Sequence, residues 1–324
     1  MQIDKSDYID LKEILDILVS EWRFLFLGTV LSAIVSVLYA LSLTNYYKSE
    51  AIFSVAGQDS MPNITGQLGP LASMAGIDLG TSGPQDKSAL TIQTIKSRSF
   101  LERLIKKEEV LPSLMASESY NSGTKKLVYK KNIYDVETDT WVRKVSYPFK
   151  PKPSVIETHT VYLSKILNIN QDKKTGFISI SIEHISPIFA QQFLELIYKE
   201  INLLMRQKDL EEATDSLAYL QTEIATNKVS EMKVPISQLM LKNLQTQMLT
   251  KVREDYVLRV IDPPYIPELK SKPSRAIICI FGTFLGTILS TIFILFSHYY
   301  EVNLFRSNSI GKKINDLLFS RIEK

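Results

Sequence analysis

The chain has 324 residues, of which 45% are hydrophobic and 23% are charged, and its formal net charge is only +3. So small a charge argues against a nucleic-acid-binding protein, because such proteins need a strongly basic surface. Cys279 is the only cysteine, so no intrachain disulfide can form, and the histidines His159, His184 and His298 are too far apart for metal-ligand spacing.

An amphipathic helix is predicted over the leader, residues 1–23. Asp10 and Glu13 have the spacing of a capping box. The apolar residues that then recur at helical intervals are Leu11, Ile14, Leu15, Leu18 and Val19. We expect this helix to lie on the cytoplasmic surface of a membrane.

Two uncharged apolar stretches, residues 24–47 and 276–300, predict membrane-spanning helices. Each has about 24 residues and, at about 1.5 Å per residue, covers about 36 Å, which exceeds the roughly 30 Å hydrocarbon core of a bilayer. The first stretch is too long for a cleaved signal peptide and lacks a good cleavage site, so we expect it to be retained.

Small residues recur at every fourth position of both stretches. They are Gly28, Ser32, Ser36 and Ala40 in the first stretch, and Gly282, Gly286 and Ser290 in the second. Such spacing lets two helix backbones approach closely in lipid, so these residues are candidates for membrane packing. The alternative is that small residues are simply common in membrane helices.

The region between the stretches, residues 48–275, is predicted to be an α+β domain with a mixed-sheet base. The expected elements are a strand over 48–56, a loop over 57–84 with an apolar patch at 69–77, a helix over 87–107, and strands over 155–169 and 177–184 around a turn at 170–176. Alternation of Ile178, Ile180 and Ile182 with polar residues predicts a sheet with one buried face. Residues 108–155 show no clear pattern.

A single long helix is predicted over residues 187–234. Ser186 is a good N-cap, Pro187 suits the first helical position, and no other Pro or Gly occurs before Pro235. Such a helix would be roughly 70 Å long. Its heptad-spaced apolar residues are Leu210, Ala213, Leu217, Leu220 and Ile224. We interpret them as an oligomer face on a projecting rod, and the alternative is packing within the chain's own domain.

The chain is then expected to return through a helix over 236–250, a strand over 255–261 and a stiff strut over 262–273. The prolines that restrict the strut are Pro263, Pro264, Pro267 and Pro273. Because the strut adjoins the second apolar stretch, we expect it to have a mechanical role, and the alternative is a simple linker.

Both termini are expected in the cytoplasm, with the middle domain outside it. Basic residues of the tail, residues 301–324, favour this orientation, whereas Lys270 and Lys272 before the second stretch oppose it.

No residue pattern predicts catalysis. The sequence shows no nucleophile triad, paired-carboxylate site, metal cluster or Gly-x-x-x-x-Gly-Lys loop, so we expect no enzyme activity and no cofactor. Trp141 and the tyrosines do not cluster along the sequence, so no glycan-binding residue stands out.

Several segments, taken in this order, resemble the Wzz-type chain-length determinants, also called polysaccharide co-polymerases. The matching segments are 9–11, 49–55, 71–77, 97–98, the long helix after Ser186, 256–267 and 271–273. Residues 108–155 are unmatched, and the proline often found in this family around 268–270 is absent. Some relatives continue into a tyrosine kinase domain, whereas this chain resembles the short form.

The resemblance implies a two-span protein of the bacterial inner membrane, with a periplasmic domain, that assembles as a homo-oligomeric ring. It implies a non-catalytic scaffold that regulates the chain length of a surface polysaccharide (O-antigen, capsule or exopolysaccharide) made by a Wzy-type polymerase, with lipid-linked polysaccharide as a further partner. Two alternatives stay open: an activator of a separate cytoplasmic tyrosine kinase acting through residues 301–324, and a two-span periplasmic sensor. An envelope transport adaptor is disfavoured, because its helical hairpin would be unbalanced.

Overall fold

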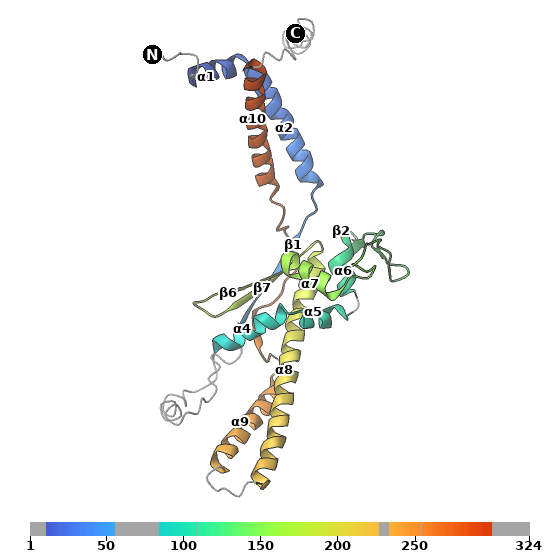
Figure 1. Cartoon of the computed structure of the whole chain (residues 1–324), viewed down its shortest axis with the longest axis vertical. Coiled ribbons are helices and arrows are strands. Elements are labelled where there is room, and N and C mark those ends of the chain that lie inside the picture. Colours follow the sequence, from blue (N-terminus) through green and yellow to red (C-terminus); the bar gives the residue numbers. More distant parts are fainter. Residues whose placement is uncertain (1–10, 56–83, 108, 227–232, 254, 300–324) are drawn as a thin grey trace. The chain divides into compact units, whose positions relative to one another are not determined.

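The computed structural model describes residues 11–55, 84–107, 109–226, 233–253 and 255–299. The chain forms two compact units, which we name the helical unit, Met1–Thr44 with Pro273–Lys324, and the sheet unit, Asn45–Lys272 (Figure 1). The predicted capping residue Asp10, the apolar patch at 69–77 and the tail at 301–324 lie outside the described residues.

The helical unit contains α1 (Leu11–Ser20), α2 (Trp22–Ser42) and α10 (Arg275–Tyr299). All 21 residues of α2 and the 23 residues Arg275–Ser297 of α10 are apolar enough to cross a membrane. Only 11% and 6% of their most apolar parts are buried, which is unlike the core helix of a soluble protein. Both helices therefore fit membrane spans in length and in exposure.

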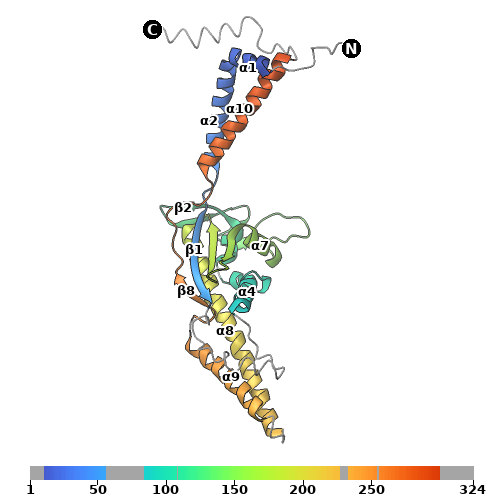
Figure 2. The same ribbon diagram turned by 90° about the vertical axis from the view of Figure 1, so that its left-hand side faces the viewer.

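The sheet unit is built on a four-stranded antiparallel sheet of order β6-β7-β1-β8 (Figure 2). Its strands are β6 (Leu167–Gln171), β7 (Ile178–His184), β1 (Tyr47–Val55) and β8 (Leu258–Asp262). The predicted strands over 48–56 and 177–184 are confirmed by β1 and β7. In the register Tyr47 pairs with His184, so β1 begins beside the residue where β7 ends.

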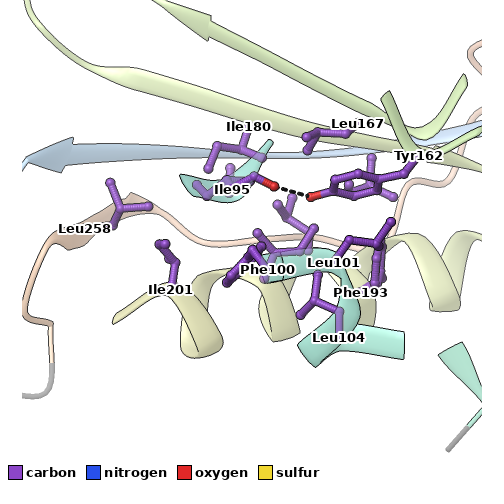
Figure 3. Close-up of a cluster of buried hydrophobic side chains, with 14 of the residues drawn as sticks. Ile95, Phe100, Leu101, Leu104, Tyr162, Leu167, Ile180, Phe193, Ile201 and Leu258 are labelled. Atoms are coloured by element: carbon purple, nitrogen blue, oxygen red, sulfur yellow. Dashed lines mark hydrogen bonds between the residues drawn. The ribbon is translucent and has the colours of Figure 1, made fainter. Parts of the chain in front are cut away.

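One face of this sheet carries the hydrophobic core (Figure 3). Ile178, Ile180 and Ile182 of β7 are buried and Ser179 and Glu183 are partly exposed, as the alternation predicted, but Ser181 of the same predicted polar set is buried. The fully buried side chains that α5 (Arg98–Ile105) and α8 (Pro187–Thr226) add to this core include Phe100, Leu101, Leu104, Phe193, Leu194, Ile197 and Ile201. Burying each such side chain contributes about 1.5–3 kcal/mol, so the cluster is the main stabiliser of the unit.

The predicted helix over 87–107 is interrupted and forms two helices, α4 (Pro84–Ile95) and α5. The break lies at Ser97, whose backbone is extended and whose side chain accepts a hydrogen bond from the Phe100 N–H at 3.2 Å. Serine competes for local backbone hydrogen bonds in this way, so it divides a run that apolar spacing alone joined.

The prediction of a strand over 155–169 is wrong for its first part. Ser154 caps a helix, α7 (Val155–Val161), by accepting a hydrogen bond from the Glu157 N–H at 3.1 Å. The chain continues through a π-helical turn, η2 (Tyr162–Ile166), and only then enters β6. The N-cap therefore outweighed the β-branched residues on which the strand prediction rested.

Two side chains of this helical stretch bind the end of α4. The buried Tyr162 hydroxyl donates to the Ile95 carbonyl at 3.2 Å (Figure 3), and His159 Nε2 donates to the Lys96 carbonyl at 2.7 Å. These bonds satisfy carbonyls that the end of a helix leaves free, which fixes the corner between α4 and α5.

Residues 109–154, which had no legible pattern, form a short helix and small hairpins. The elements are α6 (Val110–Ala116), β2 (Ser117–Asn121), β3 (Lys126–Tyr129), β4 (Tyr134–Asp135) and β5 (Thr140–Trp141). The strands pair as β2 with β3 and β4 with β5. We name residues 117–154 the lobe.

The helix expected over 187–234 is shorter than predicted, and the helix expected over 236–250 is longer. The start of the first is confirmed, because the Phe189 N–H donates to Ser186 Oγ at 3.2 Å and α8 begins at Pro187. However, α8 ends at Thr226, and a second helix, α9 (Lys233–Val252), follows. α9 starts earlier than predicted because Pro235 lies in its first turn, where a missing N–H costs nothing.

His184 is buried in its neutral form at the end of β7. Its Nδ1 accepts a hydrogen bond from the Ser186 N–H at 3.1 Å, so Nε2 carries the proton and donates to the Ser113 carbonyl at 2.9 Å. Burial lowers the pKa of His184 from 6.5 to about 4. The imidazole thus joins β7, α8 and α6 in a form that resists protonation.

The sheet unit is therefore expected to lose stability as the pH falls from 6.5 to 4. Unfolded chains protonate His184 near pH 6.5, whereas the folded chain does so only near pH 4. The contribution of neutral His184 to the free energy of unfolding is complete above pH 6.5. It declines by about 3 kcal/mol between pH 6.5 and pH 4. Thermal unfolding of the full chain in detergent should show the decline, and His184→Gln should remove it. An equal decline in the variant would contradict the assignment.

Candidate functional site

The small residues of α2 and α10 face one another along one antiparallel seam. The three pairs that meet are Gly28 with Ser290, Ser32 with Gly286, and Ser36 with Gly282. A β-carbon added to Gly286 would lie 2.1 Å from the Cβ and Oγ of Ser32 and 3.6 Å from its Cα. The two helix backbones are therefore so close that a side chain at this glycine has no room.

Polar contacts accompany the seam. Ser36 Oγ donates to the Ile278 carbonyl at 3.1 Å, and Thr29 Oγ1 lies 3.5 Å from Thr287 Oγ1. Hydrogen bonds between membrane helices contribute only about 0.6 kcal/mol on average, so close backbone packing is the larger part. The structure thus brings together, within one chain, six of the seven small residues that the spacing singled out, and the seventh, Ala40, is buried.

The α8 face expected to be an oligomer surface packs inside the chain instead. The residues concerned are Leu210, Ala213, Leu217, Leu220 and Ile224. The middle three are buried and the outer two are partly buried. α9 lies along this part of α8 (Figures 1 and 2), and its Gln247 donates to Thr214 Oγ1 at 2.9 Å. The oligomer-face interpretation is corrected to internal packing, because the longer α9 covers this face.

Replacing Leu217 by glutamate is expected to open the α8–α9 hairpin, because burying an unpaired carboxylate is costly. Amide hydrogen exchange in α9 should accelerate at least about tenfold. Tyr219→Glu is the matched control, since that side chain is 68% exposed on the same helix. Equal protection of α9 in the two variants would show that Leu217 is not an internal contact.

The proline-rich segment is a strap along the edge of the sheet rather than a free strut. Beyond β8, Ser49 Oγ donates to the Tyr265 carbonyl at 2.7 Å, and the Tyr46 N–H donates to the Lys272 carbonyl at 2.9 Å. The residues that cannot donate ladder hydrogen bonds here are Pro263, Pro264 and Pro267, and Pro273 follows in the connection to α10. The strap therefore follows β1 without forming a regular strand, and its mechanical role stays a prediction.

Asn202 of α8 binds the segment that leads from α9 into β8, and we name its hydrogen bonds to this segment the Asn202 clip. Its Oδ1 accepts hydrogen bonds from the N–H groups of Val257 at 2.8 Å and Leu258 at 2.9 Å, and its Nδ2 donates to the Leu258 carbonyl at 3.0 Å. Asn202 is buried, so it satisfies backbone groups that water cannot reach. A lone asparagine within a helical run has no distinctive pattern, which is why sequence reasoning missed it.

Two further bonds reinforce this clip. The Tyr256 hydroxyl donates to Asp209 Oδ2 at 2.6 Å, and the Tyr198 hydroxyl donates to the Asp255 carboxylate. Burial, together with the bond to Asp209, raises the pKa of Tyr256. The start of the return segment is thus bound to α8 at successive residues.

A buried carboxylate connects α8 with α5. Glu200 lies 2.8 Å from Lys107 Nζ and 3.6 Å from Arg103 Nη2. Both cations neutralise a charge that burial would otherwise penalise. In the parts of the chain that the structure describes, no three His, Cys, Asp or Glu side chains gather as metal ligands.

Trp141 clusters with tyrosines in the fold, contrary to the interpretation from sequence spacing. The Tyr134 ring centroid lies 5.2 Å from that of Trp141 and 5.7 Å from that of Tyr129. The Tyr134 hydroxyl donates to Asp139 at 2.5 Å, and this bond, with burial, raises the pKa of Tyr134 to about 12. The β4–β5 hairpin brings these rings together, and because they are partly or fully buried they form the core of the lobe.

The family model described as "Wzz: Chain length determinant protein" matches residues 7–108. A solved structure of a "full-length bacterial polysaccharide co-polymerase" is similar at 13% identity and a TM-score of 0.40, over 92% of this chain and 100% of that one. A "Fragment of WzzB, Polysaccharide Co-polymerase from Salmonella Typhimurium" is similar at 17% identity and a TM-score of 0.29, over 70% of this chain and 100% of that one. No curated protein sequence matches the chain.

Proposed function

We propose that the chain is a member of the Wzz chain length determinant family, whose model matches residues 7–108, and that it acts as a non-catalytic scaffold for a polysaccharide polymerase. In this role it regulates the chain length of a surface polysaccharide such as O-antigen, capsule or exopolysaccharide. A separate Wzy-type polymerase makes the polymer, and the growing lipid-linked polysaccharide is the further partner. The match to the family model is the observation that carries this proposal.

We place the chain in the bacterial inner membrane, with both termini in the cytoplasm and the sheet unit in the periplasm. The exposure and length of α2 and α10 support two spans, and two spans put both termini on one side. The seam between α2 and α10 supports their crossing as a pair. The sheet unit would then be tethered at both of its chain ends.

We propose that copies of the chain meet through the outer face of α9. Four of its exposed large apolar residues recur at intervals of three and four, which is one side of a helix: Leu241, Leu244, Met248 and Val252. Leu239 and Leu249 are exposed outside this series. An exposed apolar stripe of this kind is typical of a protein–protein contact. This face takes the place of the α8 face that the spacing had suggested for a homo-oligomeric ring.

Replacing Met248 by glutamate is expected to weaken self-association without opening the hairpin. Chemical crosslinking of the protein in membranes should show fewer high-order bands, while amide exchange in α9 stays slow. Lys242→Glu, at an exposed position beside the stripe and not on it, is the control. Unchanged crosslinking in Met248→Glu would exclude this face as the contact.

The function is tested by deleting the gene in its own host. The length distribution of the surface polysaccharide, resolved on a gel, should lose its preferred length and regain it when the wild-type gene is returned. An unchanged distribution in the deletion strain would contradict the proposal.

Removal of residues 301–324 separates the scaffold from a kinase activator. A defect of polysaccharide length after this truncation, in a strain without a partner kinase, would favour the scaffold. Loss of tyrosine phosphorylation in a partner protein, with no change of length in a kinase-free strain, would instead favour the activator.

A further inference from the structure

The lobe carries an exposed loop, residues 144–152, that combines aromatic and basic side chains. Tyr147 is 97% exposed and Phe149 is 56% exposed. Lys144, Lys150 and Lys152 flank them, and the loop contains no acidic residue. Single exposed apolar residues are ordinary, but two neighbouring aromatic side chains between lysines are typical of a binding surface.

Arg143 holds this loop in one conformation. Its Nε donates to the Pro151 carbonyl at 2.7 Å, and its Nη2 donates to the Lys150 carbonyl at 2.8 Å. The same guanidinium forms a bidentate pair with Glu157, with N–O distances of 2.5 and 2.7 Å. The Arg143–Glu157 pair fixes the geometry of the base of the loop. Lys144, Lys150 and Lys152 have no carboxylate within the loop to balance their charge.

The whole lobe has an excess of positive charge. It contains eight basic and four acidic residues, a surplus of four, whereas the entire chain carries only +3. Its exposed lysines are Lys125, Lys126, Lys130, Lys131, Lys144, Lys150 and Lys152. Such a surface favours an anionic partner and attracts it within about 10 Å at moderate salt.

The lobe lies at the end of the sheet where the chain enters and leaves the sheet unit. Ser117, its first residue, has its Oγ 3.4 Å from His184 Nε2, and His184 pairs with Tyr47 at the start of β1. Tyr46 in turn pairs with Lys272, the last residue of the unit. Both views show the ribbon between β2 and α7 at this end (Figures 1 and 2). The connections to α2 and α10 therefore start from the end that carries the lobe.

We propose that the loop at 144–152 docks on anionic lipid headgroups of the membrane that α2 and α10 span. Tyr147 and Phe149 enter the interface, where aromatic side chains are enriched, and the lysines contact lipid phosphates. An acidic glycan would pair with the lysines and stack on the aromatic side chains, but only lipid accounts for the place of the loop near the chain's connections. The proposal needs the two spans and is independent of the role in polysaccharide length.

The test uses the full chain, with Cys279 replaced by serine and one cysteine introduced for an environment-sensitive fluorophore. Tyr147→Cys reports on the loop, and Tyr219→Cys on α8 is the matched exposed control. Each labelled protein is reconstituted into vesicles of phosphatidylcholine alone or with phosphatidylglycerol, and quenching by lipids with a headgroup-level quencher is measured.

Strong quenching and a blue shift are expected at position 147 in the anionic vesicles, and neither at position 219. Replacing Lys144, Lys150 and Lys152 by glutamine should lower the docked-to-undocked ratio roughly a hundredfold at low salt, because each lysine contributes a factor of about five. Circular dichroism of this variant verifies its fold. Absence of quenching at position 147 in anionic vesicles would overturn the proposal. A blue shift that appears only when an acidic polysaccharide is added would assign the loop to glycan instead.

Discussion

Replacing Gly286 by leucine is expected to force α2 and α10 apart and to break the pairing of the two membrane helices. Any β-carbon at this position would lie 2.1 Å from the Cβ and Oγ of Ser32, so the helices must separate. The expected cost is on the order of 1 kcal/mol or more in the bilayer. Because α2 and α10 are the two candidate spans in the part of the chain that the structure describes, the effect should reach the whole helical unit.

A disulfide reports directly on this pairing. With Cys279 replaced by serine, Thr29→Cys and Thr287→Cys place sulfurs where the hydroxyl oxygens now lie 3.5 Å apart. Mild oxidation in membranes should join them rapidly, and Gly286→Leu should reduce the yield about tenfold. Val35→Phe adds bulk on an exposed face and should have no effect.

Exchanging the small and the larger residue between positions 286 and 32 provides a stricter control. In Gly286→Ala with Ser32→Gly, the new β-carbon meets only the Cα at position 32, at 3.6 Å, which is an ordinary contact. The double variant should therefore recover the disulfide yield that Gly286→Ala alone loses. If Gly286→Leu leaves the yield unchanged, the seam does not hold the two helices together.

Replacing Asn202 by alanine is expected to destabilise the sheet unit by about 3–5 kcal/mol, because each buried backbone group left without a partner costs about 1–3 kcal/mol. The groups affected are the N–H of Val257 and both the N–H and the carbonyl of Leu258. The return segment would lose its attachment to α8 at the point where β8 begins. Thermal unfolding of the full chain in detergent should shift down by roughly 10 °C.

Asn168→Ala is the control for this loss, because that asparagine is exposed on β6. Its effect should stay within about 0.5 kcal/mol. A shift for Asn202→Ala no larger than that of Asn168→Ala would show that the clip does not stabilise the fold.

Local sequence signals predicted the elements that depend on local chemistry. The strand β7 and the N-cap at Ser186 were both predicted from neighbouring residues, and both are confirmed. The four-residue spacing of the small residues indicated a packing surface, but only the fold shows that Ser32 meets Gly286 of the same chain.

Interactions between distant residues could not be read in this way. The heptad face around Leu217 has the same spacing whether it meets α9 or a second copy, and only the length of α9 decides between them. Likewise, Trp141 and Tyr134 become neighbours through a hairpin that pairs them, although no regular spacing marks it. Asn202 acts on residues far along the chain, so nothing near it in sequence indicates its role.

Cysteine labelling in spheroplasts tests most directly whether two spans hold the sheet unit outside the cytoplasm. In a Cys279→Ser background, Tyr219→Cys reports on the sheet unit, and Ser309→Cys reports on residues 301–324. A membrane-impermeant maleimide should label position 219 in intact spheroplasts, and position 309 only after the membrane is permeabilised. Labelling of position 309 in intact spheroplasts, or protection of position 219 until permeabilisation, would contradict this arrangement.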